Sequence, residues 1–417
     1  MDSVSQLFLQ AVKAALQQEK VSWTQEMQPQ DWIEVFRLAD THHVLPMVYE
    51  AVYDCPAAQK IDKSLFTPFK KRTLQAVMLQ AMKTSEFLRL YQHIRNAGVT
   101  PILVKGILVR ELYPNPDCRM SGDEDLLIPP EQFPLCHQAM LAYGMVLSEP
   151  DMDIHAAYEV PYGKRNSPIY IELHKSLFPP ESEAYGELNR LFARVQDTAI
   201  KVPVQGVPIL SMNHTDHLLY LLCHSFKHFL HSGFGIRQVC DIVLYANAYG
   251  SQIDWPCMLE QCKTIHAERF AAALFRIGSR YLTFDPVKAC YPQQWQDIQV
   301  DELPMLEDLL DSGVYGSSNR SRLHSSTITL NAVSAQKKGR KSGNHILKTV
   351  FPSAKALSGR YRYLEKKPFL LPVAWADRIL HYRKETAKSR DNNAAESIRI
   401  GNQRIELMKL YGVIGRD

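Results

Sequence analysis

The hydrophobic pattern divides the chain into a helical beginning, a mixed middle and a helical remainder. Up to about residue 97 the apolar residues recur at helical spacing, beginning with Val4, Leu7 and Phe8. The longest helix is predicted from about residue 65 to residue 97. Gly98 follows it and suits the left-handed conformation in which many helices end.

Between about residues 99 and 210 the pattern changes to short apolar runs, which are typical of strands. Strands are predicted at 99–104, 120–128, 145–147, 154–161 and 169–174, with a hairpin at 202–210. Short helices are predicted at 107–113 and 130–143. Strands mixed with short helices indicate an α/β or α+β unit.

The rest of the chain is predicted to be mostly helical. Helices are expected at about 214–231, 236–249, 255–265, 267–283, 301–312, 370–388 and 393–411. The segment 313–344 is rich in Ser, Gly, Asn, Lys and Arg and has few large apolar residues, which predicts a loop or linker. The chain is therefore divided into an N-terminal helical region at 1–98, an α/β core at 99–212, a helical domain at 213–312, a flexible basic linker at 313–345 and a C-terminal helical segment at 346–417.

Composition and charge add few constraints. The hydrophobic share of 46% and charged share of 22% are ordinary for a globular protein, and the net charge of +4 gives no case for nucleic-acid binding by the whole molecule. The 8 cysteines include no C-x-x-C pair, which argues against a structural zinc ribbon. The N-terminus lacks the pattern of a signal peptide, and no apolar stretch approaches the ~20 residues of a membrane span. We expect a cytoplasmic protein that does not bind a membrane.

Two carboxylates, Asp123 and Asp125, stand directly before an apolar run. On a strand, residues i and i+2 point to the same face, so the two carboxylates would lie side by side. They would repel each other unless a positive charge lay between them, and Mg²⁺ on a nucleotide's phosphates needs only one or two protein carboxylates. Glu172 stands between Ile171 and Leu173, so it faces the same cleft if these two residues are core.

Several short motifs in this part of the chain occur together in one known family. They are Lys105-Gly106 after an apolar run, Leu112-Tyr113-Pro114, Arg119, Asp123-x-Asp125-Leu126-Leu127 and Ile171-Glu172-Leu173-His174. In this set the chain resembles the uncharacterised nucleotidyltransferase family of bacteria, most strongly between residues 100 and 250. That family is similar to the polymerase-β-type nucleotidyltransferases. The resemblance implies an α+β fold: a polymerase-β-like mixed sheet with flanking helices, and helical regions at both ends of the chain.

The resemblance also implies roles for individual residues. Asp123 and Asp125 would bind Mg²⁺ or Mn²⁺, and an NTP such as ATP would be the substrate. Glu172 would be the third catalytic carboxylate, which ligates metal and receives the proton of an acceptor hydroxyl. Without the resemblance, the aspartates would be interpreted as a solvated acidic turn, and Glu172 as a carboxylate at a strand edge or a partner of Lys175.

The same resemblance places three residues at the phosphates of the nucleotide. Gly106 would bring backbone N–H groups close to them, and Lys105 and Arg119 would neutralise their charge. The alternatives are a lysine that reaches to the surface, and an arginine paired with Asp117 or Glu124.

The chain departs from the superfamily pattern at three points. The turn is Gly106-Ile107, where Gly-Ser or Gly-Gly is usual, and the gap from Gly106 to Asp123 is longer than in most of the superfamily. Glu124 stands where an apolar residue is usual, which suggests a more open strand edge or a different use of this side chain.

One predicted helix carries five histidines, His214, His217, His224, His228 and His231. His224 and His228 match histidines of the family's helix, and their spacing lets two imidazoles share one metal ion. Ser225 follows His224, so the helix lacks the H-E-x-x-H motif of a zinc protease. We expect this pair, with Arg237 and Asp241 of the next helix, to line the far wall of a nucleotide cleft. The alternative is a polar helix face that uses histidine.

These observations favour a Mg²⁺-dependent nucleotidyltransferase that moves an NMP from an NTP to an acceptor and releases pyrophosphate. The acceptor would be a sugar, a small metabolite or a protein side chain. One alternative is a catalytically silent nucleotide-binding or scaffold protein, which the unusual turn and Glu124 favour. Another is an RNA-directed nucleotidyltransferase, suggested by the basic residues between Lys337 and Arg390. Nucleic acid is not the favoured partner, because such residues are more often simply solvated.

Overall fold

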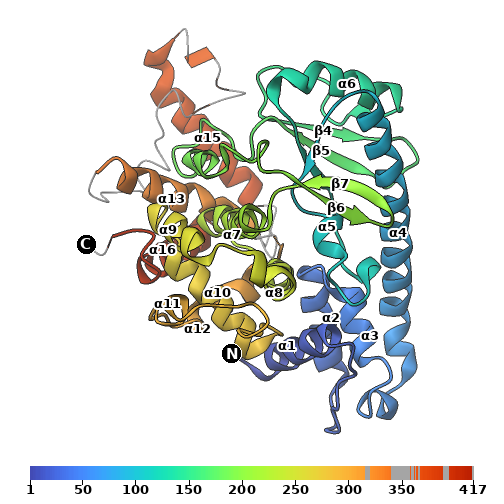
Figure 1. The fold of residues 1–417 in the computed structure, drawn as a ribbon. Coiled ribbons are helices and arrows are strands. Elements are labelled where there is room, and N and C mark those ends of the chain that lie inside the picture. Colours follow the sequence, from blue (N-terminus) through green and yellow to red (C-terminus); the bar gives the residue numbers. More distant parts are fainter. Residues whose placement is uncertain are drawn as a thin grey trace.

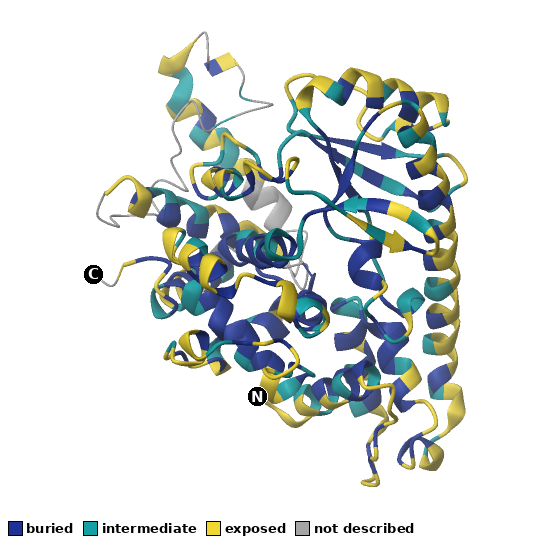
Figure 2. Ribbon diagram, in the orientation of Figure 1, coloured by how far each residue is buried: buried dark blue, intermediate teal, exposed yellow. Residues whose placement is uncertain are grey.

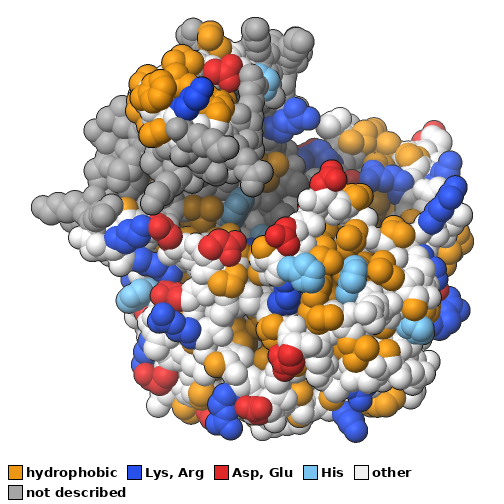
Figure 3. Space-filling view, turned by 90° about the horizontal axis from the view of Figure 1, so that it is seen from above, with side chains coloured by type: hydrophobic (Ala, Val, Ile, Leu, Met, Phe, Trp, Pro, Cys, Tyr) orange, Lys and Arg blue, Asp and Glu red, His pale blue; other side chains and the backbone are white. Residues whose placement is uncertain are grey.

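The computed structural model describes residues 1–314, 320–339, 357, 361, 363–364, 367–387 and 394–415. Most of the basic stretch between residues 340 and 366 lies outside these residues, so the structure does not test the RNA-directed alternative there. On the face seen in Figure 3, acidic and basic side chains of the described residues are interspersed rather than gathered by sign. None of the helices in the described part of the chain is both long enough and apolar enough to cross a membrane.

A seven-stranded mixed sheet lies at the centre of the middle region, in the order β3-β4-β5-β2-β1-β7-β6 (Figure 1). The strands are β1 (Ile102–Leu103), β2 (Glu124–Leu127), β3 (Val146–Leu147), β4 (Glu159–Gly163), β5 (Tyr170–His174), β6 (Ile200–Val204) and β7 (Val207–Ser211). β2 pairs with β5, and β1 with β7, in parallel, whereas the other neighbours are antiparallel. With helices flanking the sheet, this confirms the predicted α+β class.

The two faces of the sheet differ in chemistry. Leu126, Ile171 and Leu173 point to one face, where they join a buried cluster with α4 (Thr67–Asn96) and α6 (Phe133–Ala142). Because side chains alternate along a strand, Asp125 and its neighbours on β5 point to the opposite face. Figure 1 shows α4 running along the outside of the molecule, while the helices that follow β7 lie on the other side of the sheet.

Most of the remaining helices contribute residues to one continuous apolar core, which includes the N-terminal region. The helices of this core are α1 (Ser3–Leu16), α2 (Pro29–Thr41), α3 (Leu45–Val52), α5 (Ile107–Arg110), α7 (His214–His231), α8 (Ile236–Tyr249), α9 (Trp255–Thr264), α10 (Glu268–Tyr281), α11 (Gln293–Gln296), α12 (Leu303–Ser312), α13 (Arg320–Lys337) and α16 (Ala394–Leu410). None of the described residues of α15 (Leu371–Ala387) belongs to it. In Figure 2 the buried residues of these helices face inward, and the outer side of α4 is largely exposed. Asn213 caps α7, because its side chain accepts a hydrogen bond from the Asp216 N–H at 3.0 Å.

The prediction of a flexible linker at 313–345 is wrong for residues 320–337, which form the helix α13. This helix packs against α16 and α7. Its buried face mixes a few apolar residues, such as Ile328 and Val333, with small polar ones such as Ser325, Ser326 and Thr329, so its amphipathic signal is weak. Thr329 donates a hydrogen bond to the His231 carbonyl at 3.0 Å, which satisfies one of the free carbonyls at the end of α7.

The strand with the aspartates is shorter than the predicted 120–128, because β2 begins at Glu124. The backbone groups just before it are bonded to side chains of α4 instead of to a neighbouring strand. Gln80 Oε1 accepts from the Ser121 N–H at 2.9 Å, and Lys83 Nζ donates to the carbonyl of this residue and of the next at 2.6 and 2.7 Å. Asp123 therefore stands at the end of a braced loop, directly before the strand.

A fully buried histidine, His42, joins the N-terminal region to the later helices. Its Nδ1 accepts from the Ile236 N–H at 3.2 Å, and its Nε2 donates to the Leu310 carbonyl at 3.3 Å. Both bonds suit the neutral ring, and burial lowers the pKa of His42 to about 4. In the unfolded chain the ring has its ordinary pKa of about 6.5.

We predict that the free energy of unfolding depends on pH through His42. Because its pKa is depressed in the folded state, its contribution is fully present above about pH 6.5 and is lost as the pH falls toward 4. The loss between these pH values should be about 3 kcal/mol larger in the wild type than in His42→Asn, measured by urea unfolding. Equal losses in the two proteins would contradict this assignment.

Candidate active site

The pairing of β2 with β5 brings the sequence-predicted carboxylates together. In this parallel register Asp125 lies opposite Glu172, and Leu127 lies opposite His174. Paired residues on parallel strands point to the same face, so Asp125, Glu172 and His174 share the face away from α4. One ligand atom from each of these three side chains lies within 4.8 Å of the other two, a spacing that suits a single metal ion.

The donor atoms of this cluster fit a cation. His174 Nε2 lies 3.1 Å from Asp125 Oδ1 and 3.8 Å from Glu172 Oε2. The second oxygen of Asp125, Oδ2, is buried and has no hydrogen-bond partner in the described part of the chain. A buried carboxylate oxygen without a partner is costly, and a divalent cation with oxygen ligands would satisfy it.

Lys105 supplies the positive charge that the aspartates need in this structure. Its Nζ lies 3.1 Å from Asp125 Oδ1 and 3.8 Å from Asp123 Oδ2. The family resemblance predicted that Lys105 lies at the phosphates of the nucleotide. The structure places it between the two carboxylates that are predicted to bind metal. Asp123 is the more exposed of the two, and its side chain lies at the mouth of the site.

The two paired carboxylates have opposite pKa shifts. Burial raises the pKa of Glu172, and the negative charges of Asp125 and Asp123 raise it further, to about 9. Burial alone would also raise the pKa of Asp125, but the charge of Lys105 and the hydrogen bond from His174 outweigh it and lower the pKa to about 2. At pH 7 the cluster therefore carries an ionised Asp125 beside a protonated Glu172.

His174 is the member of the cluster to which the sequence assigned no role. Its spacing of two residues from Glu172 on one strand is the signal that could have found it. Its Nδ1 lies 3.6 Å from Glu159 Oε2 of β4, so the ring stands between carboxylates of three strands. His174 can either ligate a cation or orient Asp125 for one.

The histidine pair of α7 forms the wall opposite the carboxylates. His224 Nε2 lies 3.3 Å from Lys105 Nζ and 3.3 Å from His228 Nε2. Burial first, and the charges of nearby lysines second, lower the pKa of both rings well below the usual range. The pair therefore offers neutral imidazoles, whereas His214 lies elsewhere on the helix and contacts Tyr245 at 2.9 Å.

Arg119 is paired with neither of the acids considered from the sequence. Its Nε and Nη2 donate to the two carboxylate oxygens of Asp241 at 2.8 and 2.7 Å, and the Tyr113 hydroxyl donates to the same carboxylate at 2.7 Å. The pair is buried. It ties the loop before β2 to α8.

Glu124 faces away from the site, and β2 is an interior strand, so the expectation of an open strand edge is wrong. The buried Glu124 carboxylate forms an ion pair with Arg110 and accepts from the Ile107 N–H at 2.8 Å. Arg110 in turn donates to the Thr84 hydroxyl of α4 at 2.7 Å. The Ile107 N–H of the Gly106-Ile107 turn thus already has a hydrogen-bond acceptor within the protein.

Gly106 is required by this close packing. Its φ is +72°, and an added Cβ would lie 1.8 Å from Glu124 Oε2.

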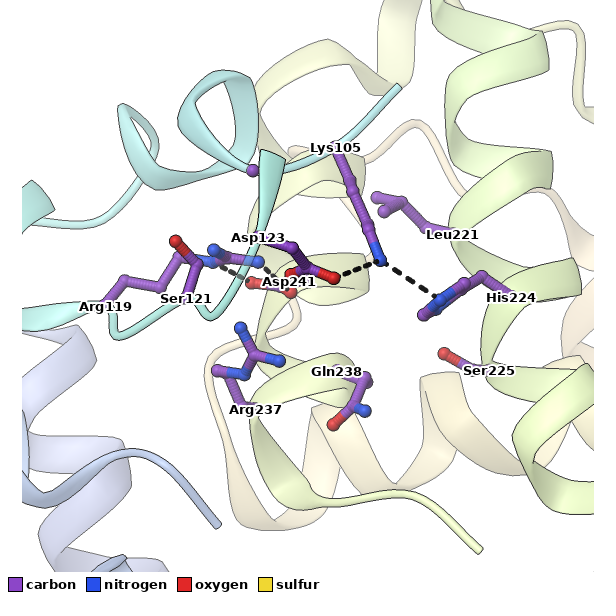
Figure 4. A pocket seen from close by; sticks show the side chains of 11 residues that line it. Lys105, Arg119, Ser121, Asp123, Leu221, His224, Ser225, Arg237, Gln238 and Asp241 are labelled. Atoms are coloured by element: carbon purple, nitrogen blue, oxygen red, sulfur yellow. Dashed lines mark hydrogen bonds and ion pairs between the residues drawn. The ribbon is translucent and has the colours of Figure 1, made fainter. Parts of the chain in front are cut away.

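A narrow pocket lies beside the carboxylates. It is lined by Lys105, Gly106, Arg119, Ser121, Asp123, Leu221, His224, Ser225, Arg237, Gln238 and Asp241 (Figure 4). The pocket lies between the sheet and the helices α7 and α8.

A mixed sheet that presents carboxylates on adjacent parallel strands, opposite basic helix residues, is a site of the kind that phosphoryl-group chemistry uses. The chain belongs to the family described as uncharacterised nucleotidyltransferase, which matches residues 28–283, more than half of its length. This match confirms the resemblance drawn from the motifs. No curated protein and no solved structure shows a significant match to the chain.

Replacement of Gly106 tests the turn directly. Gly106→Ala should destabilise the protein by about 2 kcal/mol or more, because the new side chain meets Glu124 and the backbone keeps a positive φ. Gly122→Ala is the matched control, since nothing lies within 4 Å of a Cβ there. Thermal unfolding measures both changes, and equal effects of the two substitutions would show that the turn is not constrained as described.

Proposed function

We propose that the protein transfers an NMP from an NTP to the hydroxyl or phosphate of an acceptor, with a divalent cation held by Asp123, Asp125 and Glu172. The observation that carries this proposal is the register of β2 and β5, which sets Asp125 against Glu172. In addition, Asp125 Oδ2 is buried and finds no hydrogen-bond partner among the described residues. Membership of the nucleotidyltransferase family supports the reaction type.

In this reaction an acceptor oxygen forms a bond to the α-phosphorus of the NTP. The bond between the α-phosphorus and the bridging oxygen breaks, and its electron pair leaves with pyrophosphate. Catalysis of this kind depends mainly on positioning and on stabilisation of the developing charge. Mg²⁺ or Mn²⁺, when bound, would neutralise phosphate charge and polarise the phosphorus–oxygen bonds.

The residues of the chain have separate tasks in this scheme. His174 fixes the orientation of Asp125 through the 3.1 Å contact with Oδ1. Lys105 lies within reach of both aspartates and holds positive charge where the phosphates would enter. Glu172 is the proposed base for an acceptor hydroxyl, and it accepts a proton only in its ionised form. With its pKa raised to about 9, it needs added positive charge nearby to be ionised at pH 7.

A second candidate function is a nucleotide-binding protein without catalysis. Two observations favour it: the N–H of the Gly106 turn is bonded to Glu124, and Lys105 already neutralises the aspartates. Such a protein would bind an NTP but would neither transfer the NMP nor release pyrophosphate.

Incubation with each labelled NTP, Mg²⁺ or Mn²⁺ and a cell extract should give label transfer and pyrophosphate release. Both signals should fall by more than about 100-fold in the double variant Asp123→Asn/Asp125→Asn, because two ligands of the cation lose their charge. The exposed substitution Asp151→Asn should leave them unchanged. Activity that survives the double change would exclude this cation site, and binding without turnover across many acceptors would favour the silent alternative.

A separate substitution, His174→Gln, tests the residue that the sequence did not assign. Loss of the imidazole beside Asp125 should lower transfer activity by about 10- to 100-fold, the usual effect of losing a residue that orients a metal ligand. Activity is measured at saturating Mg²⁺ and over a Mg²⁺ titration. Unchanged activity and an unchanged requirement for Mg²⁺ would remove His174 from the site.

A further inference from the structure

Three buried donors in the pocket beside the carboxylates have no hydrogen-bond partner in the described part of the chain. They are Arg119 Nη1, Arg237 Nε and Gln238 Nε2. The exposed fractions of these residues are only 3%, 5% and 5%, and all three line the same pocket. A buried N–H without an acceptor is uncommon and costly, so three in one pocket point to a ligand that supplies the acceptors.

Each of these side chains is fixed by its other polar atoms. Arg119 donates through Nε and Nη2 to Asp241, and Arg237 Nη1 donates to the Met120 carbonyl at 2.8 Å. Gln238 Oε1 accepts from the Gly235 N–H at 3.0 Å, at the start of α8. The three unpaired N–H groups are therefore held in place before any ligand arrives, which reduces the entropic cost of binding.

The charge of the pocket also favours an anion. Three cationic residues line it (Lys105, Arg119 and Arg237), against two acidic ones (Asp123 and Asp241). Asp241 balances Arg119, whereas Arg237 makes no ion pair within the described residues although it is buried. In Figure 4, Arg237 and Gln238 lie on one side of the pocket, across from Lys105. Guanidinium groups bind phosphate oxygens through several donors at once.

We propose that this pocket binds the terminal phosphates of the NTP, the part that leaves as pyrophosphate. The inference rests on the proposed function, because it assigns one end of that reaction's substrate. Lys105 and Asp123 belong both to the pocket and to the carboxylate cluster. A triphosphate could therefore lie with its reacting phosphate at the carboxylates and its terminal phosphates at Arg237 and Gln238. A phosphorylated acceptor would offer the same phosphate oxygens to the pocket. Unlike the NTP, it would not need to have another phosphate beside the carboxylates.

The sharpest variant is Gln238→Glu. A glutamate keeps the oxygen that accepts from the Gly235 N–H, and it replaces the donor at the pocket with an oxygen that repels phosphate. Arg237→Gln removes the guanidinium whose Nε has no acceptor among the described residues, and it is the second variant. Arg89→Gln is the control, because this arginine lies on the exposed side of α4. Thermal unfolding of each variant shows whether it is folded.

Dissociation constants are measured by calorimetry for pyrophosphate, ATP and AMP, and for glucose 1-phosphate as a phosphorylated acceptor probe. Gln238→Glu and Arg237→Gln should weaken pyrophosphate and ATP by about 10- to 100-fold and leave AMP unchanged, since each variant loses a hydrogen bond to a charged group. Arg89→Gln should change none of the four.

Three results would overturn the assignment. They are unchanged affinity for pyrophosphate and ATP in Gln238→Glu, an equal loss for AMP and ATP, and a loss confined to glucose 1-phosphate, which would give the pocket to the acceptor. Measurement of pyrophosphate binding in Asp125→Asn separates this inference from the proposed reaction, because this variant changes the carboxylate cluster and leaves Arg237 and Gln238 intact. If the wild type fails to transfer label but pyrophosphate binding still depends on Gln238, the reaction fails and the phosphate pocket stands.

Discussion

The parallel pairing of β2 with β5 is the constraint on which the site depends. It places Asp125 opposite Glu172 on a face where burial makes two negative charges unfavourable. The protein meets this constraint with Lys105, with a hydrogen bond from His174 and with a proton on Glu172. Each of these offsets the negative charge that a cation would offset in the proposed function. The arrangement is therefore suited to a ligand that brings its own positive charge along with phosphates.

The rest of the fold fixes the structure on both sides of the paired residues Asp125 and Glu172. Behind the strand, Glu124 and Arg110 fill the space beside Gly106 and fix the turn that carries Lys105. In front, the pair of Arg119 with Asp241 fastens α8 to the loop before β2. Further away, buried arginines of α13 and α16 donate to carbonyls at the end of α7 and pair with Asp308 of α12. The C-terminal end of the histidine-bearing helix is thus held in place.

The local sequence pattern was enough to predict the two strands that carry Asp125 and Glu172. Alternation around Glu172 correctly placed Ile171 and Leu173 in the core. The spacing of the aspartates predicted both on one strand, but β2 begins at Glu124, so only Asp125 lies on it. The family motifs then predicted the mixed sheet. Three features could not be predicted from local pattern: the partner of Arg119, the burial of Glu124 and the pocket at Gln238. Each depends on contacts between segments far apart in sequence. The helix α13 was missed because small polar residues make up much of its buried face.

The central claim is that the β2–β5 pair forms a cation site that also receives a nucleotide. The most direct test is a crystal structure with Mn²⁺ and a non-hydrolysable NTP, in which anomalous scattering locates the metal. We expect a peak about 2.1 Å from carboxylate oxygens of Asp125 and of Asp123 or Glu172, with Lys105 Nζ moved away from Asp125 Oδ1. A nucleotide bound with no metal peak at these carboxylates, and with the contact between Lys105 and Asp125 intact, would contradict it.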